Sequence, residues 1–452
     1  MMSSGDTIYA LASGAGRSGV AVIRISGGLA ATALQALSNK PMPTPRLAKL
    51  WRLSDPKTAE TLDDALVLWF PGPASFTGED VVELHVHGGL AVIEGVLAAL
   101  SQIEGLRLAE PGEFTRRAFE NAKLDLTQVE GLADLIEAET EAQRKQALRQ
   151  SEGELGAIYD GWRDQLVRAM AHFEAELDFS DEELPEDLHL AVVDSVKDLR
   201  AAIATHLKDG RRGERLRTGV RLAIIGPPNA GKSSLMNALA QREAAIVSDI
   251  AGTTRDVVEV HLNLGGYPLL VADTAGLRET GDVIEQEGVR RAKGWADTAD
   301  IKLAVFDGKS LPELDPVTRG LLETDTLVAV NKAEMVTGSL PDSIDDHPVW
   351  PLSVKTGQGM DELLARLTKM VAEKCRTQSD GPAPTRLRHT EALQRTLDAL
   401  DRFILRDNPD HLGAELEAED LRLAARELGR ITGRVDVEDL LDVIFHDFCI
   451  GK

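Results

Sequence analysis

A glycine-rich segment at residues 226–233 has the residue types and spacing of a phosphate-binding loop. Its sequence, GPPNAGKS, fits the pattern G-x-x-x-x-G-K-S, in which backbone N–H groups surround the phosphates of a nucleotide. In this pattern the side chain of Lys232 reaches the β- and γ-phosphates, and Ser233 is a ligand of Mg2+. A solvated surface lysine is the alternative interpretation, and the surrounding pattern disfavours it. The segment therefore predicts a nucleoside triphosphate site at the start of a helix.

Three further motifs follow along the chain in the order that a GTPase requires. Asp273 ends an apolar run and begins the sequence DTAG, as an aspartate on the magnesium side of the site should. The sequence NKAE at 331–334 would read the base, because a carboxylate can accept hydrogen bonds from both N–H groups on one edge of guanine. The usual motif ends in Asp, and Glu334 keeps the carboxylate, so guanine is still the favoured base. The extra methylene of Glu334 changes the geometry of its contact with the base. The sequence SVK at 353–355 resembles the loop that packs on the base.

The residue that follows DTAG indicates an unusual way of activating water. Ras-type GTPases carry a water-orienting glutamine there, whereas this chain has Leu277, which cannot hydrogen-bond to water. Asn229 and the segment SDIAGTTRD at 248–256 offer oxygen atoms suited to potassium, and a cation bridging the phosphates would do the work of an arginine finger. The spacing is about equally compatible with an Asn229 that only stabilises the loop. The predicted GTP-binding residues are Asn229, Ala230, Gly231, Lys232, Ser233, Ser234, Ser248, Asp249, Ile250, Ala251, Gly252, Thr253, Thr254, Asp273, Thr274, Ala275, Gly276, Asn331, Lys332, Glu334, Ser353 and Lys355.

The composition of the whole chain limits the classes of protein that can carry these motifs. Its 452 residues are enough for about three domains. A net charge of −24 argues against a protein that grips DNA or RNA along a broad basic face, so an RNA contact should be local or supplied by a partner. Cys375 and Cys449 are the only cysteines, so no disulfide framework is predicted. No signal peptide or apolar run of about 20 residues is visible, which favours a soluble cytoplasmic protein without a membrane partner.

The first part of the chain, residues 1–121, has the pattern of an α+β domain. Apolar runs near residues 20–25, 65–70 and 81–86 are bounded by glycine and proline and predict strands. Residues 90–100 predict a helix that follows the third strand.

The rest of the chain alternates between helical and α/β texture. Residues 122–217 repeat apolar residues at helical spacing. Residues 375–452 do so as well, after a linker-like stretch at 381–384. Residues 218–374 alternate short apolar strands with helices, the pattern in which ligand-binding loops follow the carboxyl ends of strands. The simplest architecture is one α-helical domain made of both helical segments, with a Ras-like α/β GTPase domain inserted between them.

Together with both ends of the chain, these motifs resemble the MnmE (TrmE) family of tRNA modification GTPases. The resemblance covers essentially the full length. The motifs that carry the resemblance are DTI at 6–8, IRISG at 23–27, FTGED at 76–80, HGG at 87–89, PGEFT at 111–115, KLDL at 123–126 and FCIGK at 448–452. The last of these, FCIGK, is one that a GTPase domain alone has no reason to carry.

The resemblance implies a specific biochemical role. In this family the N-terminal domain binds a tetrahydrofolate derivative and pairs the protein into a homodimer, and the hydrolysis of GTP is stimulated by potassium. The family works with the flavoprotein MnmG (GidA), which carries FAD, in a heterotetramer or larger complex. That complex adds a carboxymethylaminomethyl or aminomethyl group at C5 of the wobble uridine of tRNA.

The resemblance also implies where the folate would bind. Its contacts would fall on Arg24, Glu83, Lys123 and Lys452. A carboxylate can read the amino and N–H edge of a pterin, and cations suit the glutamate tail of a folate. Without the resemblance, Glu83 would be interpreted as an exposed strand residue.

Roles for the remaining site residues follow from the same resemblance. Glu285 would be a catalytic residue that positions the attacking water, although its place in an acidic stretch equally fits a solvated glutamate. Cys449 would be a functional thiol, the alternative being a small buried residue beside Phe448. The implied metal ligands are Ser233 and Thr254 for Mg2+, and Asn229, Ser248, Ile250 and Thr253 for K+.

Two other functions remain open at the level of sequence. A GTP-gated RNA or ribosome assembly factor would perform no modification chemistry, and it would be expected to carry a basic RNA-binding appendage. A second alternative is a scaffold and switch that leaves all modification chemistry to the flavoprotein.

Overall fold

A computed structural model of the chain describes residues 5–178, 187–242, 245–246, 259–273, 297–336, 338–376, 381–406, 411–435, 441, 444–446 and 448–452. These residues form two compact units. The first contains Met1–Ala133 and Gly429–Lys452, and the second contains Asp134–Leu428. This grouping does not test the predicted boundaries at residues 121, 217 and 374, which stay a prediction.

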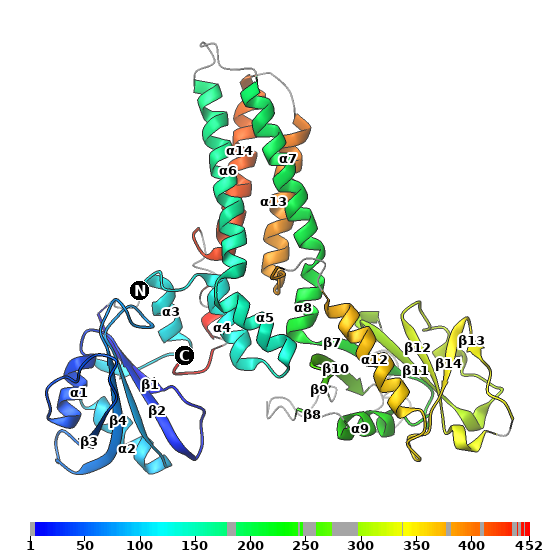
Figure 1. Ribbon diagram of the computed structural model, residues 1–452, viewed down its shortest axis with the longest axis horizontal. Coiled ribbons are helices and arrows are strands. Elements are labelled where there is room, and N and C mark those ends of the chain that lie inside the picture. The colour runs from blue at the N-terminus through cyan, green and yellow to red at the C-terminus, as the bar shows by residue number, and fades with distance from the viewer. Residues whose placement is uncertain are drawn as a thin grey trace, which may run out of the picture. The chain divides into compact units, whose positions relative to one another are not determined.

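The first unit is built on a six-stranded sheet whose strands lie in the order β3-β4-β5-β2-β1-β6. All neighbouring strands run antiparallel except β1 and β6, which are parallel. The predicted strands and helix are confirmed, with small changes at their ends. The strands are β1 (Thr7–Leu11), β2 (Ser18–Ser26), β3 (Lys49–Ser54), β4 (Thr61–Phe70), β5 (Val81–Gly88) and β6 (Leu106–Leu108), and the helices that pack on them are α1 (Ala30–Ser38) and α2 (Leu90–Ser101) (Figure 1).

Alternating burial along the strands explains why both helices contribute to one core. In β5 the side chains of Val82, Leu84 and Val86 are buried, while those between them are half-buried. These three residues share a cluster with Leu34 of α1 and Val96 of α2. A strand with a period of two presents one apolar face, and here that face receives the helices.

The last residues of the chain belong to this first unit. Phe445 and Phe448 pack with Leu126 and Val129 of α4 (Leu126–Glu137). Farther along, Ile450 forms an isolated antiparallel bridge with Pro111, directly before α3 (Glu113–Glu120). The carboxyl end of the chain therefore lies against the N-terminal part of the sequence.

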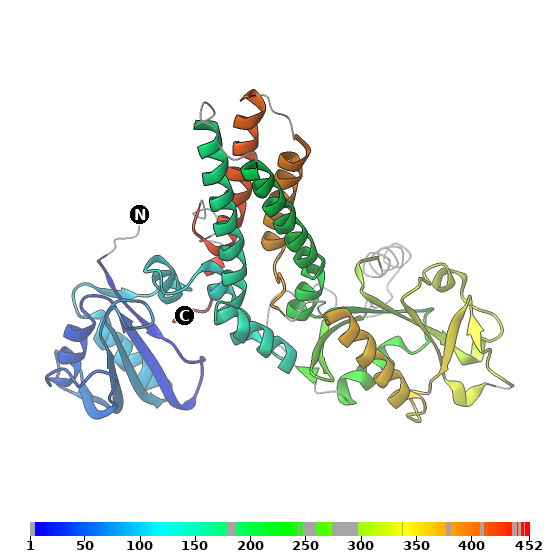
Figure 2. The same ribbon diagram turned by 45° about the horizontal axis from the view of Figure 1, so that its top comes forward.

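The second unit contains long helices that come from both sides of the α/β segment. The helices are α5 (Glu141–Ser151), α6 (Glu154–Asp178), α7 (Asp187–Lys208), α8 (Gly210–Thr218), α13 (Leu387–Arg406) and α14 (His411–Thr432). α7 packs on α6 and on α13, and Figures 1 and 2 both show these helices side by side. An ion pair joins Arg200 to Asp401, and the rings of Phe173 and Phe403 lie 5.8 Å apart. No helix within the described ranges is long and apolar enough to cross a membrane.

Between α8 and α13 the chain forms an eight-stranded sheet with the order β13-β14-β12-β11-β7-β10-β9-β8. The strands β10, β7, β11, β12 and β14 run parallel to one another, as the sequence predicts for an α/β domain. The strands are β7 (Val220–Ile225), β8 (Ala245–Ile246), β9 (Glu259–Leu264), β10 (Tyr267–Asp273), β11 (Ile301–Asp307), β12 (Thr326–Asn331), β13 (Ser343–Ile344) and β14 (His347–Pro351), with helices α9 (Lys232–Arg242), α11 (Pro316–Arg319) and α12 (Met360–Cys375).

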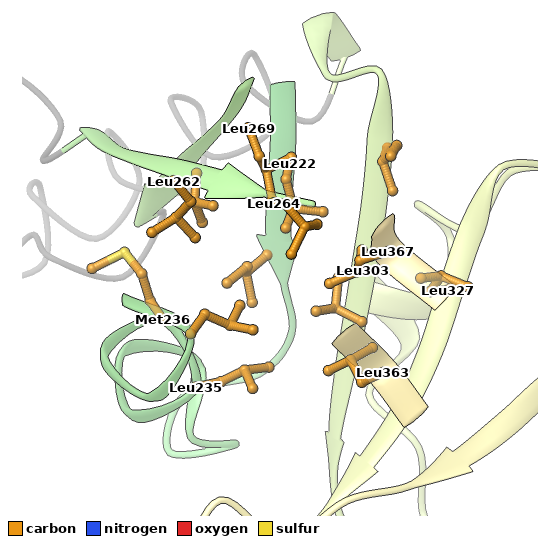
Figure 3. Close-up of a cluster of buried hydrophobic side chains, with 14 of the residues drawn as sticks. Leu222, Leu235, Met236, Leu262, Leu264, Leu269, Leu303, Leu327, Leu363 and Leu367 are labelled. Atoms are coloured by element: carbon orange, nitrogen blue, oxygen red, sulfur yellow. The ribbon is translucent and has the colours of Figure 1, made fainter. Parts of the chain in front are cut away.

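One hydrophobic core of this sheet lies on the side of α9 and α12, and a second cluster includes Ile225, Phe306 and Val330. Leu235 of α9 and Leu363 and Leu367 of α12 pack with Leu222 of β7 and Leu303 of β11 (Figure 3). These side chains hold the two helices against the strands. Because α9 begins at Lys232, within the glycine-rich segment, this packing also fixes that segment against the end of β7.

Candidate functional site

The parallel strands bring the predicted nucleotide motifs to one edge of the sheet. β7 ends at Ile225, directly before the glycine-rich segment, and Asp273 at the end of β10 pairs with Ile224. On the other side, Asp307 at the end of β11 pairs with Asn331 at the end of β12. Ligands of open α/β sheets bind beyond the carboxyl ends of such strands.

Steric restrictions show why the phosphate-binding loop needs its glycines. A β-carbon at Gly226, where φ is 154°, would overlap the carbonyl oxygen of Val305. One at Gly231, where φ is 95°, would overlap the side-chain amide of Asn331. Lys232 donates from Nζ to the carbonyl oxygens of Gly226 and Pro227, at 2.8 and 2.9 Å. Its ammonium therefore lies over the loop, which contradicts the interpretation as a solvated surface lysine.

The predicted base-reading loop is hydrogen-bonded to the phosphate-binding loop. Asn331, which is 3% exposed, donates from Nδ2 to the carbonyl oxygen of Ala230 at 2.8 Å. Its Oδ1 accepts a hydrogen bond from the backbone N–H of Val354 at 3.2 Å. Lys332 donates from Nζ to the carbonyl oxygen of Asn229 at 2.7 Å. The structure thus brings together three of the predicted stretches, at 229–234, 331–334 and 353–355.

Glu334 and Ser353 also lie together at this edge. The Ser353 hydroxyl donates a hydrogen bond that lowers the pKa of Glu334, and the backbone N–H of Glu334 itself contributes. The carboxylate therefore stays ionised at neutral pH, and it is an acceptor that can read two N–H donors of a base.

Sequence reasoning missed one acidic residue of this region, Asp307. It accepts a hydrogen bond from Lys332 Nζ on Oδ2 at 2.6 Å. Burial acts to raise the pKa of Asp307, but the hydrogen bonds from Lys332 and from the backbone N–H of Lys309 outweigh it and lower the pKa. The available signal was an acid that ends an apolar strand just before a glycine.

Several predicted residues lie outside the described residues, and the structure does not place them. For Asp273 the description extends to the backbone at the end of β10. The predicted residues that lie outside are Ser248, Asp249, Ile250, Ala251, Gly252, Thr253, Thr254, Thr274, Ala275, Gly276 and Glu285.

In the first unit, Arg24 and Glu83 face each other across β2 and β5. Arg24 donates from Nε and Nη2 to Oε1 of Glu83, at 3.1 and 2.9 Å. The Arg24 guanidinium lies 5.4 Å from the ring centroid of Phe76 and 5.7 Å from that of Phe114. Glu83 is therefore half-buried and paired, which contradicts its interpretation as an ordinary exposed strand residue.

The other two predicted folate contacts, Lys452 and Lys123, lie beside Phe114 and Gly78, respectively. The carbonyl oxygen of Lys452 accepts a hydrogen bond from the backbone N–H of Phe114 at 3.2 Å. Lys123 runs along Gly78, where an added β-carbon would lie 3.3 Å from its Cε. The structure thus brings Arg24, Glu83 and, through Phe114, Lys452 together. Phe76 and Phe114 belong to the motifs FTGED and PGEFT, and their place beside the Arg24–Glu83 pair was not predicted from the sequence.

The two cysteines have opposite environments. Cys449 is exposed, and its carbonyl oxygen accepts hydrogen bonds from the backbone N–H groups of Gly112 and Lys452. The alternative that Cys449 is a small buried residue is therefore wrong. Cys375, the last residue of α12, is 3% exposed and packs in the core of the sheet. Burial raises the pKa of its thiol to about 12, in agreement with its predicted packing role.

The fold and the motifs define a class of protein, a P-loop GTPase with an N-terminal domain and a helical domain. The family model "MnmE helical domain" matches residues 126–449, and the model "GTP-binding protein TrmE N-terminus" matches residues 7–123. The chain belongs to the MnmE (TrmE) family of tRNA modification GTPases, as the sequence resemblance predicts. It is accordingly a GTP hydrolase of tRNA modification that uses GTP and Mg2+.

Named relatives match along nearly the whole chain. A tRNA modification GTPase MnmE from Paramagnetospirillum magneticum is 57% identical over 99% of this chain and 100% of its own. A mitochondrial protein of Danio rerio, 5-taurinomethyluridine-[tRNA] synthase subunit GTPB3, is 51% identical over 99% of this chain and 93% of its own. The human protein of that name is 49% identical over 99% of this chain and 94% of its own.

Proposed function

We propose that this chain is a potassium-activated GTP hydrolase that drives a folate-dependent modification of tRNA. It acts in the cytoplasm as a homodimer with the flavoprotein MnmG (GidA), which carries the FAD. The product is a carboxymethylaminomethyl or aminomethyl group at C5 of the wobble uridine. The strongest support is that one chain carries two features. The phosphate-binding loop is hydrogen-bonded to the base loop, and Arg24 is paired with Glu83 in the N-terminal unit. The printed name of the Danio rerio relative, a 5-taurinomethyluridine synthase subunit, is consistent with this chemistry.

At the nucleotide site, each predicted residue has a role that its chemistry allows. Ser233 and Thr254 ligate Mg2+, and Lys232 contacts the phosphates. Asn331 and Glu334 bind the guanine edge. Asn229, with oxygens of Ser248, Ile250 and Thr253, holds K+, and Glu285 positions water. Potassium supplies positive charge at the phosphates, and this compensates for Leu277 in the position of the usual glutamine.

At the N-terminal site, the arrangement fits the two ends of a folate. Arg24 contacts Oε1 of the Glu83 carboxylate, and His85 Nε2 lies 3.4 Å from Oε2. Each carboxylate oxygen can accept more than one hydrogen bond, so the group can also accept from the amino and N–H edge of a pterin. Phe76 and Phe114 offer ring faces beside that pair. Lys123 and Lys452 carry the charge that suits the glutamate tail. Cys449 serves as the functional thiol in this proposal; its exposure and the backbone hydrogen bond between Lys452 and Cys449 support this role.

We also propose that the α/β GTPase domain is inserted into one helical domain. The packing of α7 on α13, together with the Arg200–Asp401 ion pair, supports this topology, because the two helices come from opposite sides of the α/β segment.

The modification function is tested by mass spectrometry of nucleosides from bulk tRNA. Cells that lack the protein are compared with the parent strain and with cells that re-express the chain. We expect the C5-aminomethyl-type wobble uridine to disappear and to return on re-expression. An unchanged nucleoside profile would favour the GTP-gated RNA or ribosome assembly factor instead.

The cation and folate parts have separate tests. At equal ionic strength, GTP hydrolysis in potassium should be much faster than in sodium, and equal rates would remove the potassium site. Calorimetric titration with 5-formyltetrahydrofolate should show binding to the wild type that Glu83→Gln weakens. Glu94→Gln, an exposed glutamate on α2, is the matched control and should bind normally.

A further inference from the structure

Lys332 connects two parts of the nucleotide site that the motifs treat as separate. Its Nζ lies 2.6 Å from Asp307 Oδ2 and 2.7 Å from the carbonyl oxygen of Asn229. The side chains of Asp307 and Lys332 are 14% and 27% exposed. Because solvent reaches this pair only in part, its geometry is more sharply fixed than that of an ion pair on the surface.

The carboxylate of Asp307 is itself fixed in place. Oδ1 accepts a hydrogen bond from the backbone N–H of Lys309 at 3.0 Å, which leaves Oδ2 for Lys332. The next residue, Gly308, lies so close to the base loop that an added β-carbon would be 2.9 Å from the carbonyl oxygen of Asn331. The turn after β11 and the base loop therefore form one packed unit.

The hydrogen bond from Lys332 restrains the backbone of Asn229. The φ of Asn229 is 62°, in the left-handed region, which asparagine adopts more readily than most residues other than glycine. The carbonyl oxygens of Asn229 and of the next residue, Ala230, are held by Lys332 and Asn331, respectively. Since two successive carbonyl groups are fixed, the direction in which the Asn229 side chain leaves the backbone is fixed as well.

We propose that Asp307 is a positioning residue for the monovalent cation, acting through Lys332 on the backbone of Asn229. The inference rests on the proposed function, in which the Asn229 side-chain oxygen binds potassium. It adds a coupling between two ligands: Lys332 belongs to the base loop, so the guanine site and the cation site share one support. Loss of the Asp307 carboxylate lets Lys332 move and releases the Asn229 carbonyl. The cation then loses an oriented ligand, while the phosphate-binding residues remain.

The test measures GTP turnover by the full chain against potassium concentration, with an inert organic cation keeping the ionic strength constant. In Asp307→Ala we expect the potassium concentration for half-maximal rate to rise about tenfold, as for the loss of one hydrogen bond to a charged group. Asp307→Asn keeps an acceptor oxygen and should show a smaller rise. Glu313→Gln removes one negative charge from an exposed residue of the same segment and should behave as wild type.

Two further measurements separate positioning from a general loosening of the fold. GDP affinity without any monovalent cation should change less in Asp307→Ala than the potassium response does. In an Asn229→Ala background, adding Asp307→Ala should shift the potassium response no further, because the residue it acts on has already lost its oxygen.

The outcomes distinguish this inference from the proposed function. Strong potassium stimulation of the wild type, together with an unshifted Asp307→Ala curve, would overturn the inference and leave the potassium site standing. An equal shift in the Asn229→Ala background would also overturn it. A wild-type enzyme that is indifferent to potassium would remove the proposed cation site and the inference with it.

Discussion

Asn331 donates its side-chain amide to the carbonyl oxygen of Ala230 at 2.8 Å, and this bond joins the base loop to the phosphate-binding loop. The neighbouring Gly231 has φ of 95° and no room for a side chain, because a β-carbon would overlap Asn331 Nδ2. The two loops therefore approach each other so closely that residue 231 has no room for a side chain.

This close approach predicts the effect of Gly231→Ala. The methyl group should force the two loops apart and weaken GDP binding by about 100-fold or more, measured by titration with a fluorescent nucleotide. Gly266→Ala is the matched control, since its φ is 89° but nothing lies within 4 Å of an added β-carbon. Similar losses in both variants would show that backbone strain, and not the contact with Asn331, is responsible.

Glu113 should contribute strongly to the stability of the N-terminal unit. It is 3% exposed and accepts hydrogen bonds from Arg107 and Arg117. Burial acts to raise the pKa of Glu113, but these arginines and the backbone N–H of Glu110 lower it on balance. Glu113→Gln should destabilise the region by about 3 kcal/mol, because it removes charged hydrogen bonds from both arginines. Arg107 then keeps Asp6, and Arg117 keeps Glu79, as acidic partners.

Amide hydrogen exchange of α3 in the full chain checks this value, which corresponds to about 100-fold faster exchange. Glu120→Gln removes the exposed partner of Arg116 on the same helix and should change exchange by less than about threefold. Equal exchange in the two variants would contradict a special role for Glu113.

Because of His206 in α7, the folded protein should lose stability in mild acid. Burial lowers the pKa of His206 from 6.5 to about 4, with nearby Asp209 opposing the shift and His389 adding to it. Between these values the unfolded chain binds a proton that the folded chain does not. Stability is therefore fully present above pH ~6.5 and decreases towards pH ~4, by about 3 kcal/mol in total.

The measurement is the thermal midpoint of the wild type and of His206→Gln from pH 7.5 to pH 4.5. Glutamine has no titrating group and can still hydrogen-bond to Tyr159, which lies 3.2 Å from His206 Nε2. Groups other than Asp209 and His389, which interact with His206, titrate alike in both proteins, so the wild-type midpoint should fall more steeply. Parallel curves would show that His206 does not resist protonation in the fold.

The two cysteines should differ sharply in reactivity. Cys375 is buried and its thiol pKa is raised to about 12, so it remains a protonated, inaccessible thiol at pH 8. Cys449 is exposed. Iodoacetamide should label the native protein at Cys449 and the unfolded protein at both positions, as peptide mass spectrometry would show. Labelling of native Cys375 would contradict the burial of α12 on the sheet.

The sequence by itself determined the elements and the motifs that follow them. The strands predicted from apolar runs, such as those near residues 20–25 and 81–86, agree with β2 and β5 because alternation and glycine stops are local properties. The phosphate and base motifs were readable for the same reason, since each is a contiguous stretch whose spacing reflects one loop.

Only the tertiary structure decided which distant residues meet. The pairing of Arg24 with Glu83, the hydrogen bond of Phe114 to Lys452, and the contact of Asp307 with Lys332 each join separate elements. The Arg24–Glu83 pair depends on strand order and register, because a shift of one residue would turn one of these side chains to the opposite face of the sheet. The other two contacts depend on how α3 and the loops after β11 and β12 pack. Sequence spacing alone does not specify the strand register, because the burial of the whole apolar face of the sheet selects it.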